Sequence, residues 1–219
     1  MARAAGREPE HAAAGAIDFE GIAHVLANTC RWGGRTRRFH SLAQHALIMA
    51  EEVEALDGVS DEDRRALVLH ALLAGARAAW LGDPDCGGPI SAKAAERARR
   101  HGARIDRALR EAAGLEPDLP EAWTDVLRFV QRMADAAERR DLGAGAVDGA
   151  NALFPPLKRR IRPLRPERAA RLWLARVREL AGTWDGDAGD PDADETADPE
   201  DARDPDEADD PDLPSAGVP

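Results

Sequence analysis

Apolar and polar residues alternate with helical spacing through the first half of the chain. Residues 17–28 and 41–56 each place their apolar side chains on one helical face, and a third such stretch runs from Ser60 to about Trp80. We therefore predict three helices here. Ser41 and Ser60 are expected to cap two of them, because a serine hydroxyl accepts hydrogen bonds from the first helical turn.

The second half of the chain has the same pattern. It predicts helices over 91–114, 120–142 and 167–182, the first of them capped by Ser91. In the last helix we expect the inward side chains to be Leu172, Leu174, Val177 and Leu180. No segment alternates with the period of a strand, so the predicted fold class is all-α, a single helical bundle.

One residue does not suit the third predicted helix. Gly75 lies in the middle of the stretch LVLHALLAGARAAWLGD, where no turn signal surrounds it. A glycine inside a helix costs about 1 kcal/mol relative to alanine. The pattern alone gives no reason for Ala74-Gly75 at this position.

Charge is unevenly distributed along the chain. The formal net charge is −11, but residues 183–219 alone carry −14, which leaves +3 on the other 182 residues. We predict a flexible leader over 1–15, a folded domain over 16–182 and a disordered acidic tail over 183–219. The tail either keeps the protein in solution or folds over the basic body and competes with anionic ligands.

Several classes of function are disfavoured by composition. Cys30 and Cys86 match no metal or redox spacing, and neither a secretory signal nor an 18-residue apolar run is present. The small basic excess and few aromatic residues argue against a nucleic-acid partner. The sequence therefore predicts a cytoplasmic protein of bacterial type with no membrane partner.

Six histidines provide the other candidate chemistry, at positions 11, 24, 40, 45, 70 and 101. They form no His-x-x-x-His pair, and the chain has no Cys-His cluster and no glycine-rich phosphate loop. Residue spacing alone therefore indicates no more than an all-α domain.

Four segments carry a resemblance to a known family. In chain order they are FEGIAHVLANTCRWGGRTRRFHSLAQH, LHALLAGARAAWLGD, AERRDL and IRPLRPERAARLWLARVREL. Together they resemble the HD-domain metal-dependent phosphohydrolases, in the bacterial group that includes the 5'-deoxynucleotidases. The similarity covers roughly residues 17–182. It implies an HD-domain helical bundle.

The metal ligands of that family are mostly missing here. In the family, a histidine, a His-Asp doublet and a distant aspartate hold a divalent metal that generates hydroxide from water. The first histidine is present as His45, whereas the doublet falls on Ala74 and Gly75. The distant aspartate falls on Gln131 or, with a different anchor, on Asp135.

The family's other site positions are partly kept. The Arg-Trp pair that contacts the nucleotide is present as Arg31 and Trp32, and the aspartate that assists proton transfer is present as Asp83. The assisting glutamate falls on Ala78, and a loop histidine falls on Arg35. The resemblance therefore implies a degenerate site in which Asp83 is a remnant.

A divalent metal needs several well-placed donors, and one histidine holds it only weakly. We therefore expect no cofactor. The alternative is a remodelled site of His45, His70, Asp135 and Asp83, which would take Mn, Co, Ni or Mg and support hydrolysis of nucleoside or deoxynucleoside phosphates.

Arginines could replace the metal as the partner of a phosphate. Arg31, Arg35 and Arg77 lie near the lost doublet or on the preceding loop, and arginine binds phosphate through paired N–H groups. With Trp32 stacking on a base, they predict a pseudoenzyme that binds a nucleotide or another phosphate ligand. The alternatives are a solvated basic loop and a protein-interaction role, as a homodimer or as a hetero-oligomer with an intact HD protein.

Overall fold

The structure is a computed structural model that describes residues 17–82, 91–143 and 154–181. These residues belong to one compact unit of the chain. The predicted leader over 1–15, the acidic tail over 183–219 and the residues Asp83 and Cys86 lie outside the described residues.

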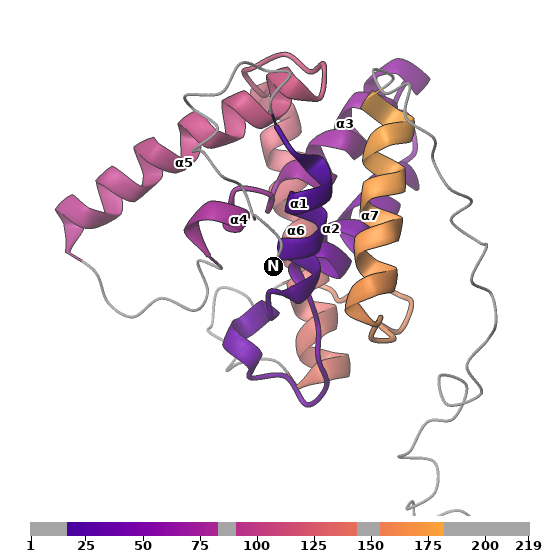
Figure 1. Cartoon of the computed structure of the whole chain (residues 1–219). Coiled ribbons are helices and arrows are strands. Elements are labelled where there is room, and N and C mark those ends of the chain that lie inside the picture. Colours follow the sequence, from indigo (N-terminus) through magenta and orange to yellow (C-terminus); the bar gives the residue numbers. More distant parts are fainter. Residues whose placement is uncertain (1–16, 83–90, 144–153, 182–219) are drawn as a thin grey trace, which may run out of the picture. The chain divides into compact units, whose positions relative to one another are not determined.

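Helices make up the regular structure of the described residues, which contain no strand (Figure 1). The helices are α1 Phe19–Asn28, the 3₁₀ helix η3 Arg31–Gly34, α2 Leu42–Glu54, α3 Asp61–Leu73, α4 Ala78–Leu81, α5 Ala92–Ala112, α6 Glu121–Leu142 and α7 Pro166–Ala181. The predicted all-α class is confirmed. Five of the six predicted helices begin and end within two residues of their expected bounds.

The predicted serine caps are present. Ser41 accepts a hydrogen bond from the backbone of Gln44, and Ser60 and Ser91 make the equivalent contacts three residues ahead. Each contact satisfies an N–H group that the helix itself leaves unpaired, and each contributes about 1 kcal/mol to helix stability. The three caps therefore fix where α2, α3 and α5 begin.

The third predicted helix is wrong in its extent, because it breaks at Ala74-Gly75. Helix α3 ends at Leu73, and α4 begins only at Ala78. Between them the backbone uses shorter i→i+3 hydrogen bonds, as from Ala78 N to Gly75 O at 3.0 Å. A Cβ atom on Gly75 would meet nothing within 4 Å, so close packing does not require the glycine. Its low helix propensity fits the place where the helix ends.

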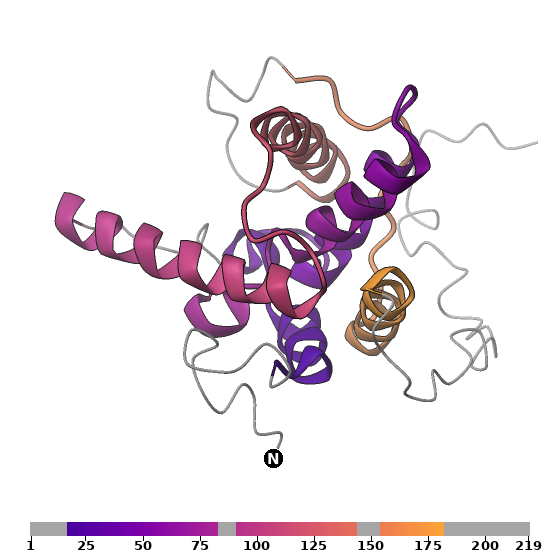
Figure 2. The same cartoon turned by 90° about the horizontal axis from the view of Figure 1, so that it is seen from above.

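Helix α2 lies at the centre of the bundle. It packs against α1, α3, α6 and α7, and nine of its 13 residues are buried. Figures 1 and 2 show the other helices arranged around it. Because α2 is enclosed, polar groups along it need partners inside the protein.

Trp173 anchors α7 in the core. Its ring is fully buried, its Nε1 donates to the carbonyl oxygen of Leu72 at 3.0 Å, and it contacts Phe19. The predicted inward face is confirmed in part. Val177 is buried, and Leu174 and Leu180 are half-buried and pack against the core, whereas Leu172 is half-buried without belonging to that core. The buried face follows Ala169, Trp173 and Val177, spaced four residues apart.

Helix α5 is only partly attached to the bundle. Its buried residues, Gly102, Ile105 and Leu109, all lie in its C-terminal half. Figures 1 and 2 both show its N-terminal half extending away from the other helices. The part of α5 that contributes to the interior is therefore residues 102–112.

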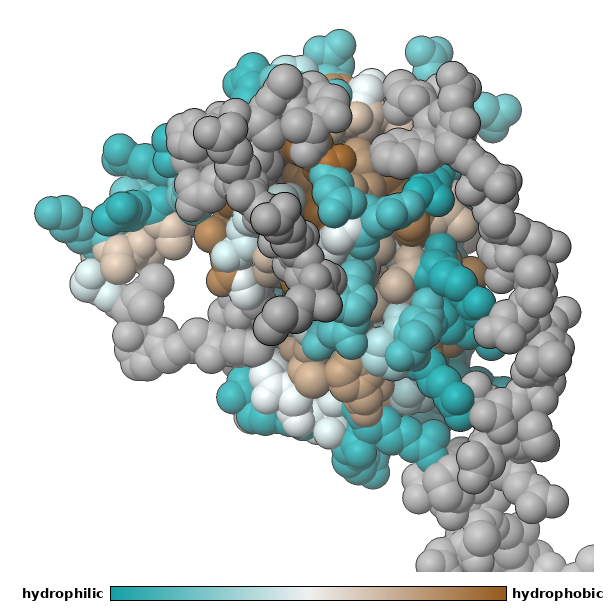
Figure 3. Space-filling model, in the orientation of Figure 1, coloured by the Kyte–Doolittle hydropathy of each residue, from teal (hydrophilic) through white to brown (hydrophobic). Residues whose placement is uncertain are grey.

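Polar side chains cover much of the face drawn in Figure 3, with smaller apolar areas between them. The large apolar side chains that are exposed in the described part of the chain are Phe39, Leu81 and Phe129. None of the described helices combines the length and the apolar composition needed to span a bilayer.

We predict that Trp173→Ala lowers the free energy of unfolding by about 3–5 kcal/mol, since it removes a buried ring and leaves a cavity. Urea denaturation measures the change. Phe129→Ala, at a ring that is 48% exposed, is the control and should change stability by less than about 0.5 kcal/mol. A small effect of the Trp173 change would contradict its role as the anchor of α7.

Candidate functional site

A cavity of about 130 Å³ lies between α2, the α3–α4 break and α6. Six residues that the sequence marked as site positions line it: Arg31, His45, Ala74, Gly75, Arg77 and Gln131. Ala78, at the position of the family's assisting glutamate, lines it as well. We call this space the arginine cavity.

A second cavity of about 240 Å³ adjoins the arginine cavity. The two share four lining residues, Met49, Ala74, Arg77 and Gln131. We call the second space the His70 cavity, because His70 from α3 and Asp106 from α5 contribute to its wall. Together the two reach the lower end of the range of about 300–1,000 Å³ typical of small-molecule sites.

His70 and Asp106 are both shifted by burial. Desolvation, with a contribution from Arg110, lowers the pKa of His70 to about 4, so its ring is neutral at pH 7. Burial raises the pKa of Asp106, while Arg77 opposes this increase. Arg77 donates to Oδ2 of Asp106 at 2.6 Å, and the other carboxylate oxygen, Oδ1, is buried without a hydrogen bond from any described residue.

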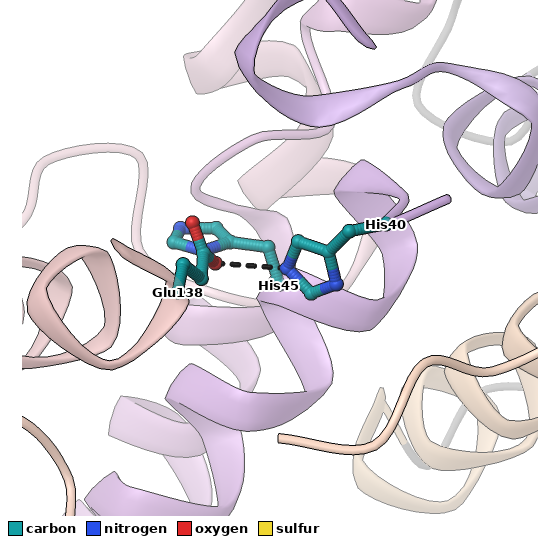
Figure 4. A group of neighbouring side chains, drawn as sticks. All are labelled: His40, His45 and Glu138. Carbon is teal, nitrogen blue, oxygen red and sulfur yellow. Dashed lines mark hydrogen bonds and ion pairs between the residues drawn. The ribbon is translucent and has the colours of Figure 1, made fainter. Parts of the chain in front are cut away.

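A buried carboxylate, Glu138 of α6, lies behind His45. Its Oε1 accepts from Nδ1 of His45 at 2.5 Å and from Nε2 of His40 at 2.9 Å, and its Oε2 accepts from Nε1 of Trp32 at 2.6 Å. Figure 4 shows both imidazole rings directed at this carboxylate. Burial alone would raise the pKa of Glu138, but the two histidines outweigh it and hold this pKa well below its ordinary value.

His40 lies between the side chains of Gln44 and Glu138. The Gln44 amide nitrogen donates to the carbonyl oxygen of Arg162, and the amide oxygen accepts from the backbone N–H of Leu164. That same oxygen lies 3.2 Å from Nδ1 of His40, whose Nε2 faces the carboxylate of Glu138. Both ring nitrogens of His40 therefore lie within hydrogen-bond distance of side-chain oxygens, which fixes the orientation of the ring.

Arg31 and Asp135 form a second buried pair beside this network. Arg31 donates to Oδ1 of Asp135 at 2.8 Å, and both side chains are less than 10% exposed. Burial raises the pKa of Asp135, against the opposing effects of His45 and Arg31. This buried ion pair lies directly beside the Glu138 network, since Nε of Arg31 is 3.7 Å from Oε2 of Glu138.

His45 is the link between this network and the arginine cavity. Its Nδ1 is used by Glu138, and within the described part of the chain its Nε2 has no hydrogen-bond partner. A histidine that donates one ring N–H to a carboxylate is fixed in orientation and tautomer. The network therefore holds His45 rigidly in the wall of the arginine cavity.

Two groups of residues can be tested as metal ligands. The ligand atoms of His40, His45 and Glu138 all lie within 4.8 Å of one another, so this buried cluster could hold a metal ion. The positions that the resemblance aligns with metal ligands lie elsewhere, in the wall of the arginine cavity. There Ala74 and Gly75 offer no side-chain donor. His45 and an amide do not fit the donor set of a catalytic divalent metal.

Several predicted site residues lie elsewhere. Trp32 does not line the arginine cavity, because its ring packs against the guanidinium groups of Arg31 and Arg139 at 4.7 and 5.4 Å. Arg35 is exposed and also lies outside the cavity wall. The expected stacking of Trp32 on a base therefore has no support in this geometry.

The set expected for a remodelled metal site is not gathered in one place. His45 faces the arginine cavity and His70 the neighbouring one, while Asp135 is paired with Arg31. Asp83, the fourth member of that set, lies outside the described residues.

Sequence reasoning assigned no role to three functional candidates: His40, which it listed only among the histidines, Glu138 and Asp106. A signal existed for Glu138, because it lies on the face of α6 that carries Val130, Ala134 and Ala137. A glutamate on an apolar helical face needs a buried partner.

No protein-family model matches the chain. The chain is 28% identical to a protein of Escherichia coli (strain K12) called "Uncharacterized protein YfdR" over 174 residues, which cover 75% of this chain and 85% of that protein. This similarity assigns neither a family nor an activity to the chain.

We predict that Glu138→Gln lowers the free energy of unfolding by about 3–5 kcal/mol at pH 7, because it leaves charged and polar partners uncompensated. Urea denaturation measures the loss. Glu121→Gln, at an exposed residue of the same helix, is the control and should have little effect.

The same variant tests the direction of the pKa shift. A carboxylate whose folded pKa is depressed stabilises the protein above its unfolded pKa, near 4.5, and this contribution is lost as pH falls below that value. The stability difference between wild type and Glu138→Gln should therefore narrow between pH 5 and pH 3. A constant difference would contradict the assignment.

Proposed function

We propose that this protein is a degenerate HD-domain phosphohydrolase homologue that binds a nucleotide-type phosphate ligand without a catalytic metal. One observation carries the proposal. The positions where the family would place metal ligands, His45, Ala74, Gly75 and Gln131, meet in one cavity together with Arg77. Of these side chains only that of His45 is an effective metal ligand, and the arginines at 31 and 77 give the cavity wall positive charge.

Arg77 is the residue best placed to bind a phosphate. It donates to Asp106 through NH1, so the guanidinium keeps further N–H donors for a ligand. Guanidinium N–H groups bind phosphate oxygens in pairs, which a hydrated lysine does less well. Arg31 is held in the same cavity wall by Asp135 and adds positive potential from a fixed position.

His45 has a positioning role in this proposal. Its Nε2 can accept from a protonated phosphate or, when the ring is charged, donate to an ionised one. Because Glu138 fixes the ring, little side-chain entropy is lost when a ligand binds.

Hydrolysis is not expected from this arrangement. In metal-dependent phosphohydrolases the ion lowers the pKa of bound water and supplies the attacking hydroxide. The arginine cavity lacks the doublet that would hold the ion and the glutamate that would move the proton, since Ala74, Gly75 and Ala78 stand at those positions. Binding can persist without those groups, whereas turnover cannot.

The second candidate is an active phosphohydrolase that uses a relocated metal. The observation that favours it is the cluster of His40, His45 and Glu138, whose ligand atoms lie within 4.8 Å of one another. A metal there would have to replace two hydrogen bonds to Oε1 of Glu138. Phosphate release from nucleoside and deoxynucleoside monophosphates, with Mn²⁺, Co²⁺, Ni²⁺ or Mg²⁺ supplied, separates the candidates.

We predict that AMP raises the melting temperature of the wild-type protein in the presence of EDTA. Ligand at 100 times its dissociation constant stabilises the folded state by about 2.7 kcal/mol. Arg77→Gln should weaken binding about 10- to 100-fold, since it removes a charge-assisted contact. Arg97→Gln, on the exposed part of α5, is the matched control. The proposal fails if neither AMP nor any other nucleoside monophosphate binds in EDTA.

A second prediction concerns the lost donors. The triple variant Ala74→His, Gly75→Asp and Gln131→Asp should bind Mn²⁺ or Co²⁺, because with His45 it supplies four ligands around one cavity. The space exists, since a Cβ on Gly75 meets nothing within 4 Å. Calorimetric titration should show one tight site in the variant and none at that affinity in wild type. Tight binding by wild type would contradict the metal-free assignment.

A further inference from the structure

A further cavity lies between α2, α7 and the irregular segment 159–164 that precedes α7. Its volume is about 440 Å³, which falls within the range of about 300–1,000 Å³ typical of small-molecule sites. It shares no lining residue with the arginine cavity or the His70 cavity. We call this separate space the α7 cavity.

Much of the wall of the α7 cavity is apolar. Six apolar side chains line it: Leu47, Ile48 and Ala50 of α2, Ile161 and Leu164 of the irregular segment, and Leu172 of α7. Leu172 is half-buried and does not belong to the core, so this cavity is where its side chain finds an apolar environment. An apolar group bound here would remove these side chains from water.

Hydrogen bonds hold the irregular part of the wall in place. The side chain of Gln44 donates to the carbonyl oxygen of Arg162 at 2.6 Å and accepts from the backbone N–H of Leu164 at 3.0 Å. The carboxylate of Asp141 accepts from the backbone N–H of Ile161 at 2.9 Å. Because the backbone is held at three positions, the cavity is preformed, and a ligand loses little affinity to the ordering of its wall.

The charged residues of this wall are paired within the described part of the chain, except for one arginine. Three arginines have acidic partners: Arg159 pairs with Glu51, Arg176 with Glu54 and Arg160 with Asp141. The side chain of Arg162 has neither a hydrogen bond nor an ion pair with any described residue. The α7 cavity therefore combines an apolar wall with one uncompensated positive charge.

We propose that the α7 cavity binds an amphipathic carboxylate, whose apolar chain lies against the leucine and isoleucine side chains and whose headgroup pairs with Arg162. A carboxylate carries a single negative charge and accepts two parallel N–H hydrogen bonds from a guanidinium. It therefore matches one uncompensated arginine. Glu51 and Glu54 are held by arginines of the same wall, which limits their repulsion of the headgroup. This inference does not depend on the proposed nucleotide site, because the cavities share no wall residue.

Isothermal titration at pH 7.5, where carboxylates are ionised, tests the proposal with butyrate, hexanoate, octanoate and 1-octanol. We expect the affinity of wild type to rise about 2- to 4-fold for each methylene group added to the carboxylate, because each one buries apolar surface. Octanoate should bind about 10-fold more tightly than 1-octanol, which has the same chain but no charge to pair with the arginine.

Three variants locate the site. Arg162→Gln should weaken octanoate binding about 10-fold and leave 1-octanol binding unchanged, since it removes only the charge. This variant should fold, because Gln44 binds the backbone carbonyl of Arg162 and not its side chain. Leu172→Trp should weaken both ligands about 10-fold by filling the cavity. Arg168→Gln, at an exposed arginine of α7 outside the cavity wall, is the matched control and should keep the wild-type affinities.

Three outcomes would overturn the inference. The first is that octanoate does not bind wild type. The second is that octanoate and 1-octanol bind wild type equally, because the arginine then contributes nothing. The third is an octanoate affinity that stays unchanged in Arg162→Gln or in Leu172→Trp, since the ligand would then lie elsewhere.

Discussion

The carboxylate of Glu138 is the interaction on which the rest of the site depends. It joins α6 to His45 of α2, to His40 before α2 and to Trp32 of η3, by three hydrogen bonds of 2.9 Å or less. A buried charge of this kind is stable only when every partner is in place. The positions of three chain segments are thus set by one anion, and the orientation of His45 in the cavity wall follows from it.

Under the proposed function, this arrangement explains how the cavity persists without the catalytic side chains. The network behind His45 does not use the positions at 74, 75 and 131, so substitutions there leave its hydrogen bonds intact. The cavity then keeps its shape and its cationic groups. Because the Glu138 network does not include these positions, substitutions in the cavity wall cost little stability. Ligand binding is then the function that the cavity retains most easily.

The sequence predicted the features that depend on local interactions. Apolar spacing located the helices, and Ser41, Ser60 and Ser91 marked their starts, because periodicity and capping involve residues within a turn or two. It missed the break at Gly75, where the surrounding apolar pattern continued. It also missed the contact of His40 with Glu138, which lie 98 residues apart, because no local pattern encodes such a pairing. The resemblance identified the positions that meet in the arginine cavity, but not the partners behind them.

Helix α5 has a mechanical property that follows from its attachment. At 1.5 Å per residue, the part of α5 before Gly102 is about 15 Å long, and the structure shows none of its residues buried among the described part of the chain. The attachment is tight, because a Cβ on Gly102 would come within 3.3 Å of the Arg77 side chain. A small tilt of α5 would therefore change the distance between Arg77 and Asp106. A partner that displaced the N-terminal half of α5 would therefore act on Arg77 and on the junction of the two cavities.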